Sequence, residues 1–245
     1  MNPLLEARAI SRSFGGVQAL DRIELSVNGG EVLGLIGPNG AGKTTLFNVI
    51  CGLRPTAGRV LFKGEDITGL PPHQICRRGI ARTFQLTRPF AELSVRDNIA
   101  AAVLFGRNPR RVTGLHEARR TADLVLSSVK LDRRREARAG ELLFSERRRL
   151  ELARALATSP ELLLLDEVMA GLTVGEAQEM VEILGVLRRE FSLTLLVIEH
   201  VMKVVMTMCD RIVVLDHGEK LAEGTPEMVA GHRAVIDAYL GVASA

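Results

Sequence analysis

The chain has 245 residues, of which 47% are apolar and 25% charged, and its formal net charge is +3. Such a composition can bury a full core, in one large domain or a core with an inserted subdomain, and it excludes a disordered chain. Apolar runs such as ELLLLDE and TLLVIEH are about seven residues long, far short of the roughly 20 that cross a bilayer, and no apolar leader opens the sequence. We therefore expect a soluble, intracellular protein. Cys51, Cys76 and Cys209 lack CxxC spacing and are expected to be free thiols.

The charge is unevenly distributed along the chain. Residues 86–156 contain 16 Lys and Arg against 9 Asp and Glu. A basic surface of this kind can face nucleic acid or anionic lipid. Because no aromatic residues alternate with the arginines to stack on bases, we interpret them as solvated outer faces of helices and expect no nucleic-acid partner.

The first third of the chain has strand-like alternation. Residues 4–14 and 19–37 alternate between apolar and polar side chains, and Asn28-Gly29-Gly30 is predicted to form a hairpin turn between strands. After Gly42 the segment KTTLFNVI has helical periodicity, and GRVLFKGEDI and GIARTF return to strand character. The beginning of the chain is therefore predicted to be rich in β-structure.

From Leu93 to Thr158 the strand pattern stops and a helical insert is predicted. Apolar residues recur there at spacings of three and four, as at Leu115, Ala118, Ala122, Val125 and Val129. Beyond Pro160, the near-continuous apolar runs ELLLLDE and TLLVIEH are separated by an amphipathic helix at 177–188, which is typical of a parallel sheet covered on both faces. DRIVVLDHGEKLAEG is predicted to be two strands joined at His217-Gly218, and residues 226–240 are predicted to be helical.

One motif has a specific chemical meaning. GPNGAGKTT matches the pattern GxxxxGK[ST] and lies after a predicted strand and before a predicted helix. Glycines let the backbone approach phosphate closely, successive N–H groups and the helix N-terminus bind the anion, and the lysine adds a positive charge. The predicted nucleotide-binding residues are Gly37, Pro38, Asn39, Gly40, Ala41, Gly42, Lys43, Thr44 and Thr45, with Thr44 as a Mg²⁺ ligand.

Acidic residues and a histidine follow the two later buried strands. Asp166 ends LLLLD and can hold the water shell of a magnesium ion, while Glu167 can orient or deprotonate the attacking water. His200 ends TLLVIEH, where it can reach a γ-phosphate. Each residue alone is more often an incidental strand end, but together with the phosphate loop they predict a hydrolytic site.

These motifs, with Gln85 in RTFQ, occur in the order and spacing of ATP-binding-cassette (ABC) ATPases, which the chain resembles over essentially its whole length. Within that family, GIARTFQLTRPFAELSVRDNI, MAGLTVGE, VIEHVMKVVM and EGTPEMVAGHRAVIDAYLG are most similar to the ATPases of branched-chain (hydrophobic) amino-acid importers. The resemblance implies an α/β P-loop NTPase fold with a parallel sheet, an N-terminal antiparallel β-subdomain and an inserted helical subdomain. It implies one nucleotide-binding domain over residues 1–245, with the core at 1–86 and 157–245 and the helical subdomain at 87–156.

The resemblance also implies roles for single residues. Lys43, Gln85, Glu167 and His200 would be catalytic, with ATP and Mg²⁺ as cofactors, and Gln85 would sense the γ-phosphate and contact the metal. Phe14 would stack on adenine, although a Phe in an alternating strand is often part of the core. No NKxD motif is present, which favours ATP over GTP.

The segment ELLFSERRRLELARAL departs from the family pattern. The family's signature loop, usually LSGGQ, binds the nucleotide of a partner subunit, and here it aligns with residues 142–146. Leu143 replaces the serine, so a hydrogen bond to the γ-phosphate worth about 1.5–3 kcal/mol is lost. Ser145, at the start of a helix, is predicted to contact that nucleotide in trans, and Glu146 is predicted to face outward. Val168 and Thr173 also depart from the residues that the family prefers after the acidic pair.

The resemblance implies an ATPase that drives a membrane transporter from the cytoplasmic face of the inner membrane, as a peripheral subunit. Its expected partners are transmembrane permease subunits near Gln85, a second ATPase subunit and, indirectly, a solute-binding protein. The altered signature favours a heterodimer slightly over a homodimer. Three alternatives stay open: the ATPase of a lipid or lipopolysaccharide exporter, an ABC ATPase that does not serve transport, and a regulatory subunit with negligible turnover.

Overall fold

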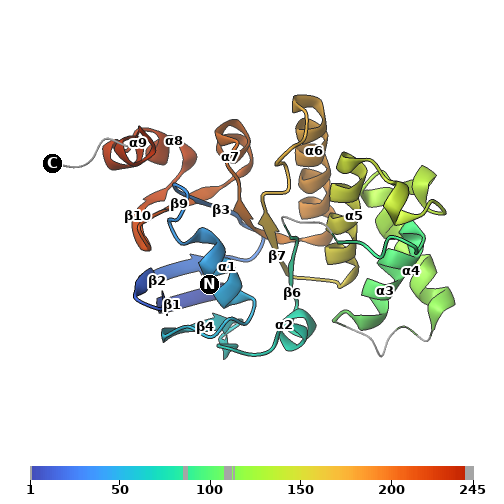
Figure 1. The fold of residues 1–245 in the computed structure, drawn as a ribbon, viewed down its shortest axis with the longest axis horizontal. Helices are drawn as coiled ribbons and strands as arrows, with labels where there is room; N and C mark the ends of the chain where they lie inside the picture. Colours follow the sequence, from blue (N-terminus) through green and yellow to red (C-terminus); the bar gives the residue numbers. More distant parts are fainter. Residues whose placement is uncertain (1, 85–87, 108–111, 113, 241–245) are drawn as a thin grey trace. The chain divides into compact units, whose positions relative to one another are not determined.

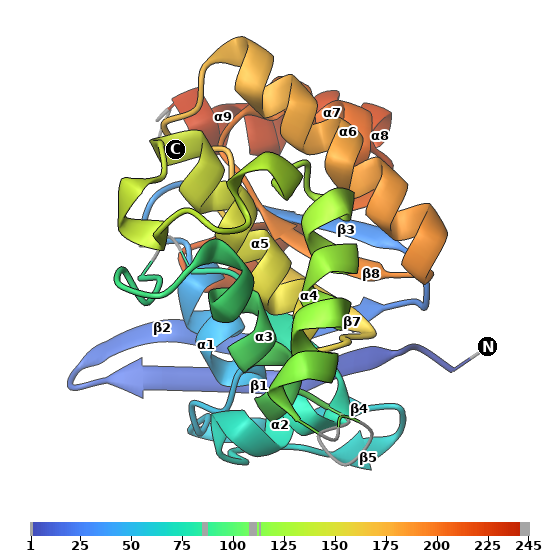
Figure 2. The same cartoon turned by 90° about the vertical axis from the view of Figure 1, so that its right-hand side faces the viewer.

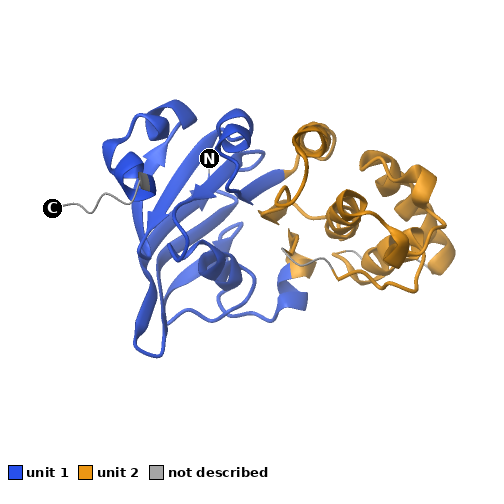
Figure 3. Ribbon diagram, turned by 45° about the horizontal axis from the view of Figure 1, so that its top comes forward, with its two compact units in different colours: residues 1–75, 194–245 blue, residues 76–193 orange. Residues whose placement is uncertain are grey.

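The computed structural model describes residues 2–84, 88–107, 112 and 114–240 (Figure 1). The chain divides into two compact units (Figure 3). Unit 1 contains Met1–Ile75 and Thr194–Ala245, and unit 2 contains Cys76–Leu193. The predicted boundaries of the helical subdomain, at 87 and 156, do not coincide with this division and stay a prediction.

Unit 1 begins with an antiparallel sheet in the order β2-β1-β4-β5. The strands are β1 (Leu5–Phe14), β2 (Val17–Val27), β4 (Ala57–Phe62) and β5 (Glu65–Asp66). β1 and β2 form a long hairpin, seen clearly in Figure 2, and the turn between them is Gly15-Gly16, with Gly15 at φ 57°. A tight turn needs this positive φ, which glycine adopts without strain. The predicted antiparallel N-terminal region is therefore confirmed.

The prediction of a hairpin turn at Asn28-Gly29-Gly30 is wrong. β3 (Val32–Ile36) follows this segment but pairs in parallel with β8 (Thr194–Ile198) and β9 (Arg211–Asp216), not with β2. All five residues of β3 are buried, and such a strand is stable only in a sheet covered on both faces. Asn28-Gly29-Gly30 therefore connects two sheets.

The C-terminal part of unit 1 contains the two strands and the turn that the sequence predicts. β10 (Glu219–Gly224) pairs antiparallel with β9 across the predicted turn at His217-Gly218. The unit also contains α1 (Lys43–Ile50), α7 (Met202–Met208), α8 (Pro226–Ala230) and α9 (Arg233–Leu240), while α2 (Pro72–Arg78) contains the boundary between the units. The predicted C-terminal helix is thus divided into α8 and α9.

Unit 2 combines two parallel strands with helices. β6 (Ile80–Arg82) pairs with β7 (Leu162–Asp166), all five residues of which are buried. The helices are α3 (Val95–Phe105), α4 (Leu115–Ser128), α5 (Phe144–Ala157) and α6 (Val174–Phe191), with the short 3-10 turns η2 (Asp132–Arg134) and η3 (Ala139–Glu141). Figure 2 shows α3, α4 and α5 packed side by side.

The apolar pattern of α4 is largely as predicted. Ala118, Ala122 and Val129 are fully buried, and Val125 is half-buried, but Leu115 is 50% exposed and Leu126 is buried in addition. Leu115 is the first residue of the helix, so the predicted face is wrong at its first position. Among the helices that the structure describes, none is long and apolar enough to span a membrane.

Candidate functional site

The phosphate loop of unit 1 connects β3 to α1 and is packed tightly at two glycines. A Cβ on Gly37, at φ 147°, would lie 2.0 Å from the carbonyl oxygen of Leu215. A Cβ on Gly42, at φ 100°, would lie 2.6 Å from the carbonyl oxygen of Ala19. These glycines let the loop rest directly on the backbone of β9 and β2, a packing role that the motif alone did not predict.

Lys43 is held against the same loop. Its side chain is nearly buried, and Nζ donates hydrogen bonds to the carbonyl oxygens of Gly37 at 2.7 Å and Pro38 at 2.8 Å. Three ammonium donors permit such anchoring while leaving a positive charge beside the loop. The lysine is therefore preorganised within the loop.

The start of α1 is suited to an anion. Its N-cap is Gly42, which makes no side-chain capping hydrogen bond, and no acidic residue lies in the first turn. Uncapped N–H groups and the helix dipole favour negative charge. Asn39, Gly40 and Thr44 of the same loop are exposed, so an incoming phosphate has access to this surface.

Tyr239 is a residue of this neighbourhood that sequence reasoning missed. Burial raises the pKa of the Tyr239 hydroxyl, and a hydrogen bond with the backbone of Gly37 partly offsets the rise. The C-terminal helix α9 thus reaches the first residue of the phosphate loop. In the sequence, the one signal for Tyr239 was that it lies in VIDAYLG, part of the ending that resembles the importer ATPases.

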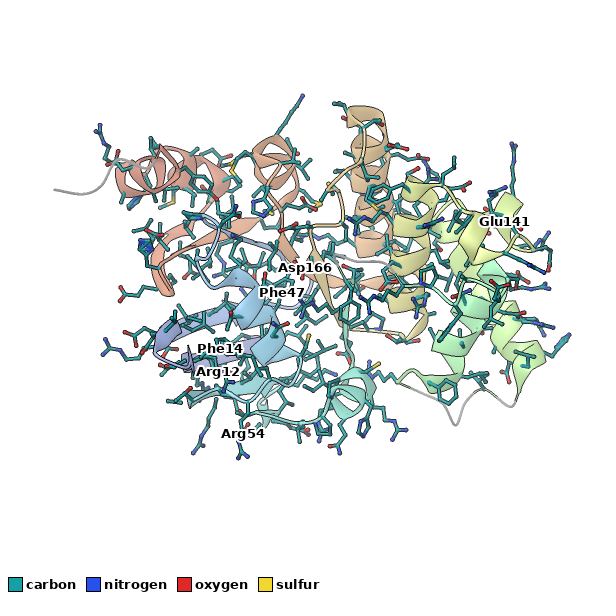
Figure 4. The ribbon with its side chains drawn as sticks, viewed as in Figure 1. Arg12, Phe14, Phe47, Arg54, Glu141 and Asp166 are labelled. Carbon is teal, nitrogen blue, oxygen red and sulfur yellow. The ribbon has the colours of Figure 1, made fainter. Side chains whose placement is uncertain are left out.

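Two other predicted residues of unit 1 are accessible. Phe14 is 46% exposed, with the Arg12 guanidinium 4.6 Å from its ring centroid (Figure 4). The exposure excludes the alternative that Phe14 belongs to the core. His200 is also exposed and follows the buried Glu199 at the end of β8.

The acidic pair lies in unit 2 at the carboxyl end of β7. Asp166 is 5% exposed, and its Oδ2 accepts a hydrogen bond from Arg82 Nη2 at 2.6 Å. Sequence reasoning did not identify Arg82, because nothing local links it to Asp166. Glu167 has φ 50°, in the left-handed region that non-glycine residues rarely adopt. Strained backbone of this kind is concentrated at functional sites.

The signature segment opens α5. Leu143 and Phe144 are 68% and 50% exposed, whereas Ser145 is 8% exposed. A hydrogen bond from the Ser145 hydroxyl is the main cause that lowers the pKa of Glu176. Glu146 accepts the N–H of Leu143 at 2.9 Å, which stabilises the start of the helix. The carboxylate of Glu146 is therefore turned back onto its own helix.

One face of α5 contacts backbone groups on both sides of Gln85, at Phe84 and Arg88. Arg148 Nη1 donates to the carbonyl oxygen of Phe84 at 3.5 Å. Burial raises the pKa of Glu151, and Arg154 together with a hydrogen bond from the Phe84 backbone partly offsets the rise. Arg154 Nη1 donates to Glu151 Oε2 at 3.0 Å and to the carbonyl oxygen of Arg88 at 3.3 Å. Gln85 itself lies outside the described residues.

Each unit has an oxygen donor of the kind that Mg²⁺ takes. Thr44 of unit 1 has a hydroxyl and Asp166 of unit 2 a carboxylate, and Mg²⁺ takes oxygen ligands with several retained waters. Within the described part of the chain, no cluster of three or more His, Cys, Asp or Glu side chains could hold a metal by protein ligands alone. A metal shared among protein, phosphate and water would need no such cluster.

Comparison with known families decides the classification. The ABC transporter family matches residues 20–170, which include the phosphate loop and the acidic pair. The chain belongs to the ABC transporter family. It is accordingly an ABC ATPase, and the P-loop NTPase fold expected from the resemblance is confirmed. Residues 219–245, which include α8 and α9, match a second family described as branched-chain amino acid ATP-binding cassette transporter.

Relatives of this ABC ATPase match almost its full length. The high-affinity branched-chain amino acid transport ATP-binding protein BraF of Pseudomonas aeruginosa is 41% identical over 98% of this chain and 99% of that protein. LivG of Escherichia coli, which bears the same description, is 40% identical over the same shares. A solved structure of MJ1267, an ATP-binding cassette of an ABC transporter, has a TM-score of 0.88 with 32% identity, over 98% of this chain and 99% of that one.

Proposed function

We propose that this ABC ATPase hydrolyses ATP to drive the import of branched-chain or other amino acids through a membrane permease. The observation that carries the chemistry is the preorganised phosphate loop, in which Lys43 is anchored to the loop's own carbonyl oxygens. The transported substrate is inferred from relatives described as high-affinity branched-chain amino acid transport ATP-binding proteins, which match over nearly the whole chain.

In this proposal the predicted residues act on one nucleotide. The loop from Gly37 to Thr45 binds the phosphates, Phe14 stacks on adenine, and Thr44, Gln85 and Asp166 hold Mg²⁺, in part through water. Bound there, the ion would supply positive charge that offsets the charge of the phosphates. Glu167 orients or deprotonates the attacking water, and His200 contacts the γ-phosphate.

The proposed partners are integral membrane permease subunits, with a solute-binding protein acting indirectly, and the ATPase lies peripherally on the cytoplasmic face of the inner membrane. Exposed apolar side chains next to Gln85 support a docking role for this part of unit 2. Phe84, Phe90 and Leu93 are 56%, 54% and 42% exposed. A docked permease subunit would cover these side chains.

The signature segment supports a pair of unlike ATPase subunits. Ser145 is largely buried and bonded to Glu176, and Leu143 has no hydroxyl. A partner with a standard signature would supply the contact that this chain lacks. The altered residues Leu143 and Ser145 also support one competing function, a regulatory subunit with negligible turnover.

The rate of ATP hydrolysis distinguishes a transport ATPase from a regulatory subunit with negligible turnover. Glu167→Gln is expected to reduce the hydrolysis rate of the assembled complex by roughly 100-fold or more, while ATP binding measured with a fluorescent analogue is retained. Glu190→Gln, which changes an exposed carboxylate of unit 2, provides the control. An unaltered rate in the Glu167→Gln complex would favour the regulatory function.

A second experiment tests which molecule is transported. Co-purification with amino-acid permease subunits would support amino-acid import, whereas co-purification with lipid-export subunits would contradict it.

A further inference from the structure

Asp166 already has a close cationic neighbour within unit 2. The 2.6 Å contact between Arg82 Nη2 and Asp166 Oδ2 joins two side chains that are only 10% and 7% exposed. A charge-assisted hydrogen bond of this length is strong, and a buried ion pair is screened little by salt. Arg82 is therefore a buried counter-ion of this carboxylate and not a surface contact.

The pair is fixed by the strands that carry it. β6 runs parallel to β7 with Arg82 opposite Leu164. The N–H of Thr83 donates to the carbonyl oxygen of Leu164 at 3.0 Å, and the N–H of Asp166 donates to Thr83 Oγ1 at 3.2 Å. These bonds hold the backbone on both sides of the ion pair. The Arg82 guanidinium also lies 5.6 Å from the ring centroid of Phe84.

A second cation at Asp166 must share its charge with Arg82. The attraction between a carboxylate and a divalent ion weakens when a guanidinium already neutralises one oxygen, and the effect is large where water is excluded. Removal of Arg82 would leave the buried carboxylate uncompensated, so that any other bound cation would be held more tightly.

We propose that Arg82 is a positioning residue that holds Oδ2 of Asp166 and thereby lowers the affinity of this carboxylate for the magnesium ion that accompanies ATP. The inference rests on the proposed role of Asp166. Arg82 also precedes Gln85 by three residues, so the strand that positions the counter-ion is the strand that leads to the predicted γ-phosphate sensor.

Magnesium titration of nucleotide binding tests this proposal. The full chain is mixed with a fluorescent ATP analogue, and the free Mg²⁺ concentration at half-saturation is measured, together with binding in EDTA. Arg82→Met is expected to lower that concentration roughly fivefold or more. Arg82→Lys, which keeps the charge but not the planar contact, is expected to lower it less. A half-saturation concentration that is unchanged or raised in Arg82→Met would overturn the proposal.

Two further comparisons make the result specific. Arg138→Met removes an arginine from an exposed ion pair with Glu92, and it should leave the magnesium dependence unchanged. In an Asp166→Asn background, Arg82→Met should have no effect, and a shift as large as in the wild type would contradict an action through the carboxylate. If Arg82→Met does not fold, Arg82→Gln, which is also uncharged, replaces it, and an unchanged half-saturation concentration in that variant rejects the proposal.

The titration also distinguishes this inference from the proposed function. Wild-type protein that binds no ATP analogue at any magnesium concentration would reject the function itself. Wild-type protein that binds the analogue, with Arg82 variants that do not shift the magnesium dependence, would reject only the role of Arg82.

Discussion

Gly37 and Gly40 show how one loop uses glycine for two different purposes. Both have positive φ, 147° at Gly37 and 81° at Gly40. A Cβ on Gly37 would meet the carbonyl oxygen of Leu215 at 2.0 Å, whereas a Cβ on Gly40 would find nothing within 4 Å. Gly37 is therefore needed for packing within unit 1, and Gly40 lies on the open side of the loop that the sequence assigns to phosphate.

At this scale, alanine substitutions should separate packing from ligand binding. Gly37→Ala is expected to lower the free energy of unfolding by about 3 kcal/mol or more, because backbone strain and a clash with backbone act together. Gly40→Ala should lower it by only about 1 kcal/mol from strain but should weaken ATP binding. Urea denaturation and analogue binding measure the two effects. Equal losses of stability would contradict the explanation.

At the scale of elements, α5 does more than present the signature segment. Arg148, Glu151 and Arg154 recur at spacings of three along one face. The first two contact the backbone of Phe84, and Arg154 contacts that of Arg88. Arg154 also lies 5.5 Å from the ring centroid of Phe90. The helix that begins with the signature therefore also holds the backbone on both sides of Gln85.

Glu151 makes this contact sensitive to pH. Burial raises its pKa above the ordinary value of 4.5, so ionisation is harder in the folded protein than in the unfolded chain. Protonated Glu151 therefore contributes to the free energy of unfolding at pH values below its ordinary pKa. This contribution is lost as the pH rises through the raised pKa of the folded protein. Glu151→Gln retains an acceptor for the Phe84 N–H and cannot ionise.

The stability of Glu151→Gln relative to wild type is therefore expected to improve as the pH rises from 4 to 7. Urea denaturation at several pH values measures this difference. Glu92→Gln, which removes a carboxylate that is 86% exposed in its side chain, serves as the control for loss of one negative charge. A difference between Glu151→Gln and wild type that stays constant with pH would rule out the raised pKa.

At the scale of the whole molecule, we predict that the assembly state depends on the signature. The phosphate loop and His200 belong to unit 1, and the acidic pair and the signature belong to unit 2. In the ABC ATPases that the chain resembles, a partner subunit's signature closes the nucleotide site. With Leu143 exposed and Ser145 bonded to Glu176, two copies of this chain should close weakly over ATP.

Light scattering of the Glu167→Gln variant measures this closure, because blocked hydrolysis retains the closed dimer. The variant alone is expected to stay monomeric with ATP and Mg²⁺ and to shift to the dimer mass when a second ATPase with a standard signature is added. A dimer formed by the variant alone would show that Leu143 and Ser145 still bind the partner's nucleotide, and homodimeric function would then be the simpler account.

The sequence by itself determined the features that are local in the chain. The phosphate loop, the buried strands, the turn at His217-Gly218 and the family are all carried by contiguous residues, whose spacing already specifies backbone shape and chemistry. Tertiary structure decided what depends on residues far apart. It placed Arg82 on Asp166 across 84 positions, brought α5 onto Phe84, and paired β3 with β8 and β9 instead of β2. No local pattern encodes such contacts, because they arise only when strands and helices distant in the sequence pack together within a unit.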